Sequence, residues 1–111
     1  DLLGKDGAIK KLIKNAVEAS PQGGEVIVDT RRDERALVAI TNQGEVSAGI
    51  RERFFDKYVT VGKREGTGLG TYAAKLITSI HKGDITLDTS EPGRTTVRVD
   101  LPGVSDTEPL L

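Results

Sequence analysis

The sequence predicts an α+β domain: a two-layer sandwich in which helices cover one face of a mixed, mostly antiparallel sheet. Two observations support this fold class. Two pairs of short, β-branched segments are each joined by a polar turn, which indicates two hairpins. An amphipathic helical pattern precedes each hairpin and supplies the second layer. A doubly wound parallel sheet would instead need strands and helices to alternate throughout the chain.

The first helix is expected over residues 6 to 19, because apolar residues recur there at intervals of three and four. They form one stripe: Ile9, Leu12, Ile13, Ala16 and Val17. The turn-forming residues 20 to 24 then end the helix. The first hairpin follows, with strands over 25 to 29 and 36 to 41 and a charged link over 30 to 35.

The second helix is expected over residues 70 to 81, with a buried face made of Leu69, Ala73, Leu76, Ile77 and Ile80. Gly83 is assigned to the C′ position just beyond its end. The second hairpin has strands over 84 to 89 and 95 to 101, joined by the turn 90 to 93.

Between the two halves lies a long, glycine-rich stretch, residues 42 to 69, in which only a short helix over 50 to 58 is expected. A connection of this length in a small domain is typical of a binding loop or a lid. We therefore look for chemistry there first.

Composition excludes several functional classes. The chain has 111 residues, enough for one domain, which we assign to residues 1–102 with a tail over 103–111. Sixteen basic and 17 acidic side chains leave a net charge of -1, which disfavours nucleic-acid binding. The absence of Cys excludes disulfides and thiolate metal sites, and a single His excludes multi-His sites. No apolar run approaches the length of a membrane span, so no direct membrane contact is expected. The chain starts at Asp1, and we expect it to be a fragment of a larger protein.

The strongest local motif is the glycine run that enters the second helix: Gly66, Thr67, Gly68, Leu69 and Gly70. Glycines let the main chain approach an anion, and the free amides at a helix start favour phosphate. The run is neither a P-loop nor a dinucleotide fingerprint, since its spacing differs from both. The alternative is a flexible turn.

Two asparagines are further candidates. Asn15 lies at the edge of the first helix's apolar stripe, on the same flank as Lys11 and Glu18. Its amide oxygen is a suitable Mg²⁺ ligand, although a helix-surface Asn beside a charge pair is the alternative. Asn42, with Gln43 and Gly44 after it, ends a strand and could read a base edge or simply begin a turn.

Several cations complete the candidates. Lys57, Lys63 and Arg64 precede the glycine run and are available to phosphate oxygens or to solvent. His81 lies in the last turn of the second helix, where the helix dipole favours a cation.

Taken together and in order, these motifs resemble the catalytic ATP-binding domain of bacterial sensor histidine kinases, within the GHKL ATPase superfamily. The resemblance covers about residues 6 to 102. It is carried by segments similar to the family's N box, first glycine box, F box, second glycine box, His-Gly-Gly segment and closing Gly-Thr-Thr strand: residues 12–20, 42–44, 53–58, 66–70, 80–85 and 93–102.

The resemblance implies a Bergerat fold with an ATP lid, and it implies roles for individual residues. Asn15 would ligate the Mg²⁺ of Mg-ATP. Asn42 would face the adenine amino group, with Gly44 admitting the base and Thr95 supporting the same contact. Lys57 and Lys63 would approach the phosphates from the lid. The amides of the glycine run would cradle these phosphates, and the implied ATP-binding set also includes Glu18 and Thr67.

The implied chemistry is transfer of the ATP γ-phosphoryl group to a histidine on a separate dimerisation domain, in two-component signalling with a response regulator downstream. The site is expected in the cytoplasm, with any membrane anchor elsewhere in the parent protein. No phospho-acceptor helical hairpin is visible in this chain, so the implied catalytic His is absent. The isolated chain is therefore not expected to autophosphorylate.

Three residues depart from the family pattern. Asn42 stands where the family has Asp, Val46 replaces the second glycine of the first glycine box, and Lys11 replaces a frequent Asn. An Asn oxygen still accepts from an amino group but lacks charge assistance, a loss of roughly 1 kcal/mol. Two alternatives stay open: a degenerate domain that docks to a partner without nucleotide, and an anti-sigma-type serine kinase on the same fold.

Overall fold

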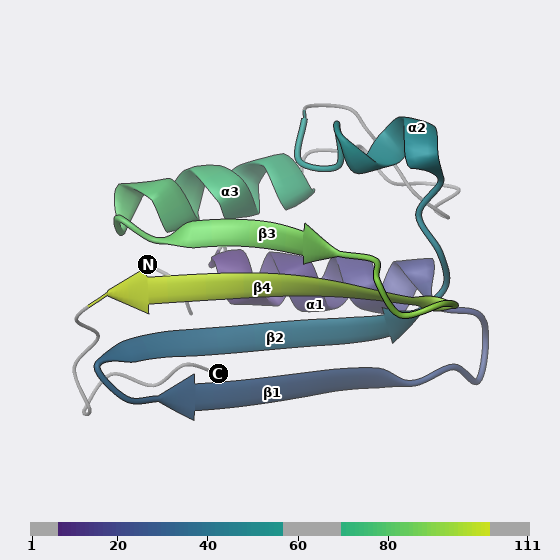
Figure 1. Ribbon diagram of the computed structural model, residues 1–111, viewed down its shortest axis with the longest axis horizontal. Coiled ribbons are helices and arrows are strands. Elements are labelled where there is room, and N and C mark those ends of the chain that lie inside the picture. The colour runs from purple at the N-terminus through teal and green to yellow at the C-terminus, as the bar shows by residue number, and fades with distance from the viewer. Residues whose placement is uncertain (1–6, 57–69, 103–111) are drawn as a thin grey trace.

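A computed structural model describes residues 7–56 and 70–102 (Figure 1). It contains three helices and four strands within these ranges. In chain order they are α1 (Ala8–Ala19), β1 (Val26–Arg32), β2 (Arg35–Gln43), α2 (Ala48–Arg51), α3 (Gly70–Ile80), β3 (Asp84–Asp88) and β4 (Arg94–Pro102). The two hairpins and the two main helices expected from the sequence are confirmed, with ends shifted by at most a few residues.

The four strands form one sheet in the order β1-β2-β4-β3. Every strand pairing in the described part of the chain is antiparallel, so no parallel pair gives the sheet the mixed character expected from the sequence. The central pair is β2 with β4, in which Asn42 lies opposite Thr95 and Val38 opposite Val99. In the view of Figure 1, α1 lies behind β4, and no helix within residues 7–56 and 70–102 covers the near face of the sheet, which we call the open face. The α+β sandwich with helices on one face is confirmed.

The core forms where the alternation of β2 and β4 meets the apolar stripe of α1. Inward residues of the two strands are almost fully buried: Ala36, Val38 and Ile40 on β2, and Val97, Val99 and Leu101 on β4. Ile9, Leu12 and Ala16 of α1 pack into the same cluster. Val17, expected on this stripe, is 57% exposed because it lies on the outer side of the helix. Strand periodicity of two and helix periodicity of 3.6 thus determine this layer.

The buried face of α3 differs from the expected one. Leu76 and Ile80 are 48% and 75% exposed, whereas Thr71, Ala74 and Thr78 are buried. The helix contacts both α1 and β3, and small residues let it approach them closely. The buried hydroxyls cost little, since each is hydrogen-bonded to a carbonyl: Thr71 to that of Phe54 and Thr78 to that of Ala74.

The end of α3 is a Schellman motif displaced by one residue from the expected position. Lys82, not Gly83, has the left-handed conformation, with φ of 60°. The amide of Gly83 donates to Thr78 O at 2.9 Å, and that of Lys82 donates to Ser79 O at 2.9 Å, as the motif requires. Gly83 is needed for a different reason. A Cβ there would lie 2.6 Å from Asp100 O and 2.6 Å from a Leu101 methyl group.

The short helix expected over 50 to 58 is instead α2, a single turn over Ala48–Arg51 followed by further turns to Asp56. Arg51 Nε donates to Val46 O at 3.1 Å and ties this turn to the end of the strand before it. No helix within residues 7–56 or 70–102 has the length and apolar character needed to cross a membrane.

Candidate functional site

A pocket of about 90 Å³ lies where α1 ends, β2 ends and β4 begins. Four separate parts of the chain build it: α1, the end of β2, the turns after α2 and the start of β4. Its lining combines polar and apolar residues: Asn15, Ala19, Asn42, Gly44, Glu45, Val46, Phe54 and Thr95. Four of the residues expected in the site, Asn15, Asn42, Gly44 and Thr95, are therefore brought together by the fold.

Asn42 and Thr95 form the polar wall of this pocket. They lie opposite each other on β2 and β4 and are only 6% and 3% exposed. Asn42 Nδ2 donates to the main-chain oxygen of Gln43 at 2.9 Å, so the amide oxygen is the end left to accept. Thr95 Oγ1 donates to Gly44 O at 2.8 Å, which uses its one hydroxyl proton. Both side chains can therefore act on a ligand as acceptors.

Gly44 makes this arrangement possible. Its φ of +123° lies in a region that side chains rarely adopt, so the turn after Asn42 requires glycine. Its amide donates to Gly93 O at 2.8 Å. The amide of Gly93 in turn donates to Glu45 Oε1 at 2.9 Å. The turn between β3 and β4 is thus fastened to the end of β2, beside the pocket.

Asn15 lies on the opposite wall, on α1, and is 8% exposed. Its amide is the one polar side chain that the helix contributes to the pocket lining. Within residues 7–56 and 70–102 there is no group of three or more His, Asp or Glu residues that could hold a metal. A single amide oxygen such as that of Asn15 suits a Mg²⁺ ion that takes most of its oxygen ligands from a bound nucleotide and water.

The rest of the wall is apolar. Val46 and Phe54 are 3% and 5% exposed and contribute both to the pocket and to the core. Val46, which replaces a family glycine, thus acts as a packed wall residue. The ring of Phe54 meets that of Phe55 edge to face, with centroids 5.0 Å apart and planes at 84°. Lys75 Nζ lies 6.0 Å from the centroid of Phe55.

The other expected site residues are distributed as follows. Glu18 is exposed on α1, where its carboxylate lies 3.9 Å from Lys14 Nζ, and it is not among the residues that line the pocket. Gly70 begins α3. The remaining ones lie outside the described residues: Lys57, Lys63, Arg64, Gly66, Thr67, Gly68 and Leu69.

Four lining residues, Ala19, Glu45, Val46 and Phe54, were not among the site residues expected from the sequence. Ala19 continues the helix face of Asn15, so spacing along α1 could have found it. Phe54 was recognised within the F-box segment without a role in the site. Glu45 offered no signal, because its position depends on the hydrogen bond to Gly93, far away in the sequence.

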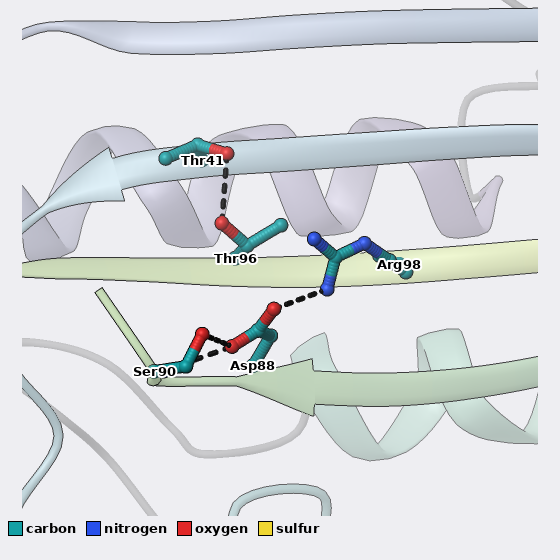
Figure 2. Close-up of polar contacts among 5 residues, drawn as sticks. All are labelled: Thr41, Asp88, Ser90, Thr96 and Arg98. Atoms are coloured by element: carbon teal, nitrogen blue, oxygen red, sulfur yellow. Dashed lines mark hydrogen bonds and ion pairs between the residues drawn. The ribbon is translucent and has the colours of Figure 1, made fainter.

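The opposite face of the sheet is also polar, but its side chains bond with one another (Figure 2). Thr41 and Thr96 share a hydroxyl–hydroxyl hydrogen bond of 2.8 Å across β2 and β4. Asp88 accepts from the Ser90 hydroxyl at 2.6 Å, from the Ser90 amide at 2.8 Å and from Arg98 at 2.6 Å. These bonds, those from Ser90 most of all, hold the pKa of Asp88 well below its usual value.

Comparison with known proteins places this geometry in a family. The family described as histidine kinase-, DNA gyrase B-, and HSP90-like ATPase matches residues 6–105. The sensory histidine kinase/phosphatase NtrB of Azospirillum brasilense is 37% identical over 108 residues, covering 82% of this chain and 26% of its own. The alginate biosynthesis sensor protein KinB of Pseudomonas aeruginosa is 34% identical over 97 residues, covering 85% of this chain and 16% of its own.

Among solved structures, the mycobacterial sensor histidine kinase MprB superposes with a TM-score of 0.76 at 28% identity, covering 86% of this chain and 68% of its own. The chain spans about a quarter or less of the two curated relatives above. These matches confirm the resemblance to the catalytic ATP-binding domains of sensor histidine kinases. The chain belongs to the family of histidine kinase-, DNA gyrase B- and HSP90-like ATPases.

Proposed function

We propose that the pocket binds the adenine of Mg-ATP and that, in a longer parent protein, this domain supplies the γ-phosphoryl group to a histidine on a separate dimerisation domain. A response regulator would then receive the phosphoryl group, in the cytoplasm. The observation that best supports nucleotide binding is the polar wall of the pocket, formed by Asn42 and Thr95. Asn42 and Thr95 are buried side chains that each donate one hydrogen bond to a main-chain carbonyl, which leaves the Asn42 amide oxygen and the Thr95 hydroxyl oxygen as acceptors.

A pocket wall made of hydrogen-bond acceptors favours a ligand that carries hydrogen-bond donors. The exocyclic amino group of adenine donates two hydrogen bonds, which suits the Asn42 amide oxygen and the Thr95 hydroxyl oxygen. Guanine presents a carbonyl oxygen at the same ring position. Two acceptors facing that oxygen would leave buried polar atoms unpaired, at a cost of about 1–3 kcal/mol. The arrangement therefore favours ATP over GTP.

The same geometry explains how Asn serves at a position where the family has Asp. The bond from Asn42 Nδ2 to Gln43 O leaves the amide oxygen available to accept a hydrogen bond, as a carboxylate oxygen would be. The missing charge weakens the contact by about 1 kcal/mol without reversing its polarity. This supports nucleotide binding over a degenerate docking domain.

We expect Mg²⁺ and the phosphates to bind away from the adenine contacts, near Asn15 and the glycine run. Asn15 would offer its amide oxygen to Mg²⁺, which neutralises charge on the phosphates when bound. From the sequence, the amides of residues 66–70 and the cations Lys57 and Lys63 would contact the phosphates. The chain itself contributes orientation and charge, and the acceptor histidine has to come from another domain.

Calorimetric titration of the chain with a non-hydrolysable ATP analogue, with and without Mg²⁺, tests the proposal. We expect binding that depends on Mg²⁺ in the wild type and loses this dependence in Asn15→Ala. Lys14→Ala, one position away on the exposed side of the same helix, is the matched control and should bind normally. The GTP analogue should bind at least about fivefold more weakly, from the unpaired acceptors above.

A folded wild-type chain that binds neither nucleotide would contradict the proposal and point to the degenerate docking domain. We also expect no radiolabel on the isolated chain after incubation with γ-labelled ATP, since the acceptor histidine lies elsewhere. Label on a serine would point to the serine-kinase alternative instead.

A further inference from the structure

We infer that Thr71 is a positioning residue for the nucleotide pocket: its hydroxyl holds Phe54, a wall of that pocket, against the first turn of α3. The inference rests on the proposed function, because the pocket matters only if it holds a ligand. It adds a residue that the family motifs leave without a role.

The contact is buried and links distant parts of the chain. Thr71 is 4% exposed, and its Oγ1 donates to the main-chain oxygen of Phe54 at 3.1 Å. Phe54, 5% exposed, lines the pocket together with Asn15 and Asn42. The two bonded residues are 17 positions apart, on either side of residues 57–69.

Phe54 needs such support because little regular structure holds it. It follows α2, a single turn, and lies in a run of further turns. The neighbouring bonds are local: Arg53 N to Ile50 O at 2.9 Å, and Asp56 N to Arg53 O at 2.9 Å. Such bonds shape the turns but do not fix where they lie relative to the rest of the fold. The Thr71 hydroxyl adds a long-range hydrogen bond to the core packing of Phe54, next to the contact of Lys75 with the Phe55 ring.

A second threonine on the same helix shows what Thr71 does differently. Thr78 is fully buried, and its Oγ1 donates to Ala74 O, one turn earlier in α3, at 2.7 Å. That bond satisfies the hydroxyl within the helix and joins nothing else. The Thr71 hydroxyl is used on another segment of the chain. The two positions share residue type, helix and burial, and differ in the bonded partner.

The test compares Thr71→Val, Thr71→Ser and Thr78→Val in the full chain, by titration with the ATP analogue and Mg²⁺. Valine keeps the shape of threonine and removes the hydroxyl. We expect about fivefold weaker binding for Thr71→Val, from the loss of one hydrogen bond of about 1 kcal/mol, and binding within about twofold of wild type for the other two variants. Equal affinities of Thr71→Val and Thr78→Val would overturn the inference, as would a Thr71→Ser variant as weak as Thr71→Val.

A second readout does not need the nucleotide. The ring proton resonances of Phe54 should move in ligand-free Thr71→Val and stay in place in Thr78→Val and Thr71→Ser. Unmoved Phe54 resonances in Thr71→Val would overturn the inference even if the wild type failed to bind ATP, so the two failures can be told apart. If Thr71→Val does not fold, Thr71→Cys, with a much weaker donor of similar size, takes its place with the same expected outcomes.

Discussion

The two faces of the sheet carry polar side chains of similar kinds, but use them differently. Thr41 and Asn42 are neighbours on β2 and point to opposite faces. On the open face, Thr41 bonds with Thr96, Arg98 with Asp88, and Arg35 with Asp100 at 2.6 Å. In the pocket, Asn42 and Thr95 bond to main-chain oxygens and keep their own oxygens for a ligand. The difference shows that a polar side chain's partner, rather than its type, indicates whether it is available for binding.

The apolar side chains should give the largest difference between the two faces. Leu101 on β4 faces the helices and is 1% exposed, whereas Leu37 on β2 faces outward and is only partly buried. Leu101→Ala should lower the free energy of unfolding by about 2–5 kcal/mol, because it leaves a cavity in the core. Leu37→Ala should lower it by about 1 kcal/mol or less. Urea denaturation measures both, and similar losses would contradict the division into a core face and an open face.

Replacing the polar residues at two adjacent β2 positions should affect ligand affinity very differently, because the two side chains lie on opposite faces of the sheet. Asn42→Leu removes the acceptor from the pocket and should weaken binding of the ATP analogue about tenfold, the equivalent of about 1.4 kcal/mol. Thr41→Val removes one hydroxyl from the Thr41–Thr96 pair and should leave affinity unchanged within twofold. Titration calorimetry gives both values. An affinity loss in Thr41→Val as large as that in Asn42→Leu would show that the faces are not functionally separate.

The sequence was sufficient to predict the layer that periodicity governs. Apolar residues alternate with polar ones along the strand expected over 95 to 101, and Val97, Val99 and Leu101 are indeed the inward residues of β4. The stripe of Ile9, Leu12 and Ala16 predicted the inward face of α1. For α3 the same reasoning was only partly correct: Ile77 packs against the core as expected, but the helix buries Thr71 and Thr78 instead of Leu76 and Ile80. Threonine can take the buried side only where a carbonyl accepts its proton, and the Phe54 carbonyl is brought there by tertiary structure.

The candidate site divides in the same way. Asn15, Asn42 and Thr95 lie in regular elements and Gly44 directly follows one, and the family resemblance carried by the order of the motifs was enough to assign all four to one site. Phe54 and Glu45 lie in turns whose placement depends on long-range bonds to Thr71 and Gly93. The residues next to Phe54 and Glu45 in the sequence do not indicate these distant partners. For this reason Phe54 was given no role and Glu45 was missed.

Lowering the pH should reduce the stability of the fold through Asp88, which lies on the open face of the sheet and not in the pocket. The pKa of Asp88 is lowered in the folded state by its bonds to Ser90 and then Arg98. Its contribution to stability is therefore complete above the ordinary Asp pKa near 3.9 and is lost as the pH falls below that value toward the lowered folded-state pKa. Urea midpoints measured between pH 7 and pH 2 should fall less steeply below pH 4 in Asp88→Asn than in the wild type. Parallel curves would show that the Asp88 bonds do not stabilise the fold.

Substitution of Glu45 should give the smallest change in ligand affinity. Glu45 joins the end of β2 to the turn between β3 and β4 through one exposed hydrogen bond. Its carboxylate accepts from the amide of Gly93, and Gly93 accepts from Gly44 beside the pocket. Water can replace an exposed acceptor, so Glu45→Ala should weaken ATP-analogue binding only about twofold, while Glu45→Gln, which keeps the acceptor, should match the wild type. Glu91, paired with Arg94 at 3.6 Å in the same turn, provides the control, since it does not line the pocket. If Glu91→Ala weakened binding as much as Glu45→Ala, the effect would come from the charge of the turn, and the hydrogen bond to Gly93 would have no part in holding the pocket.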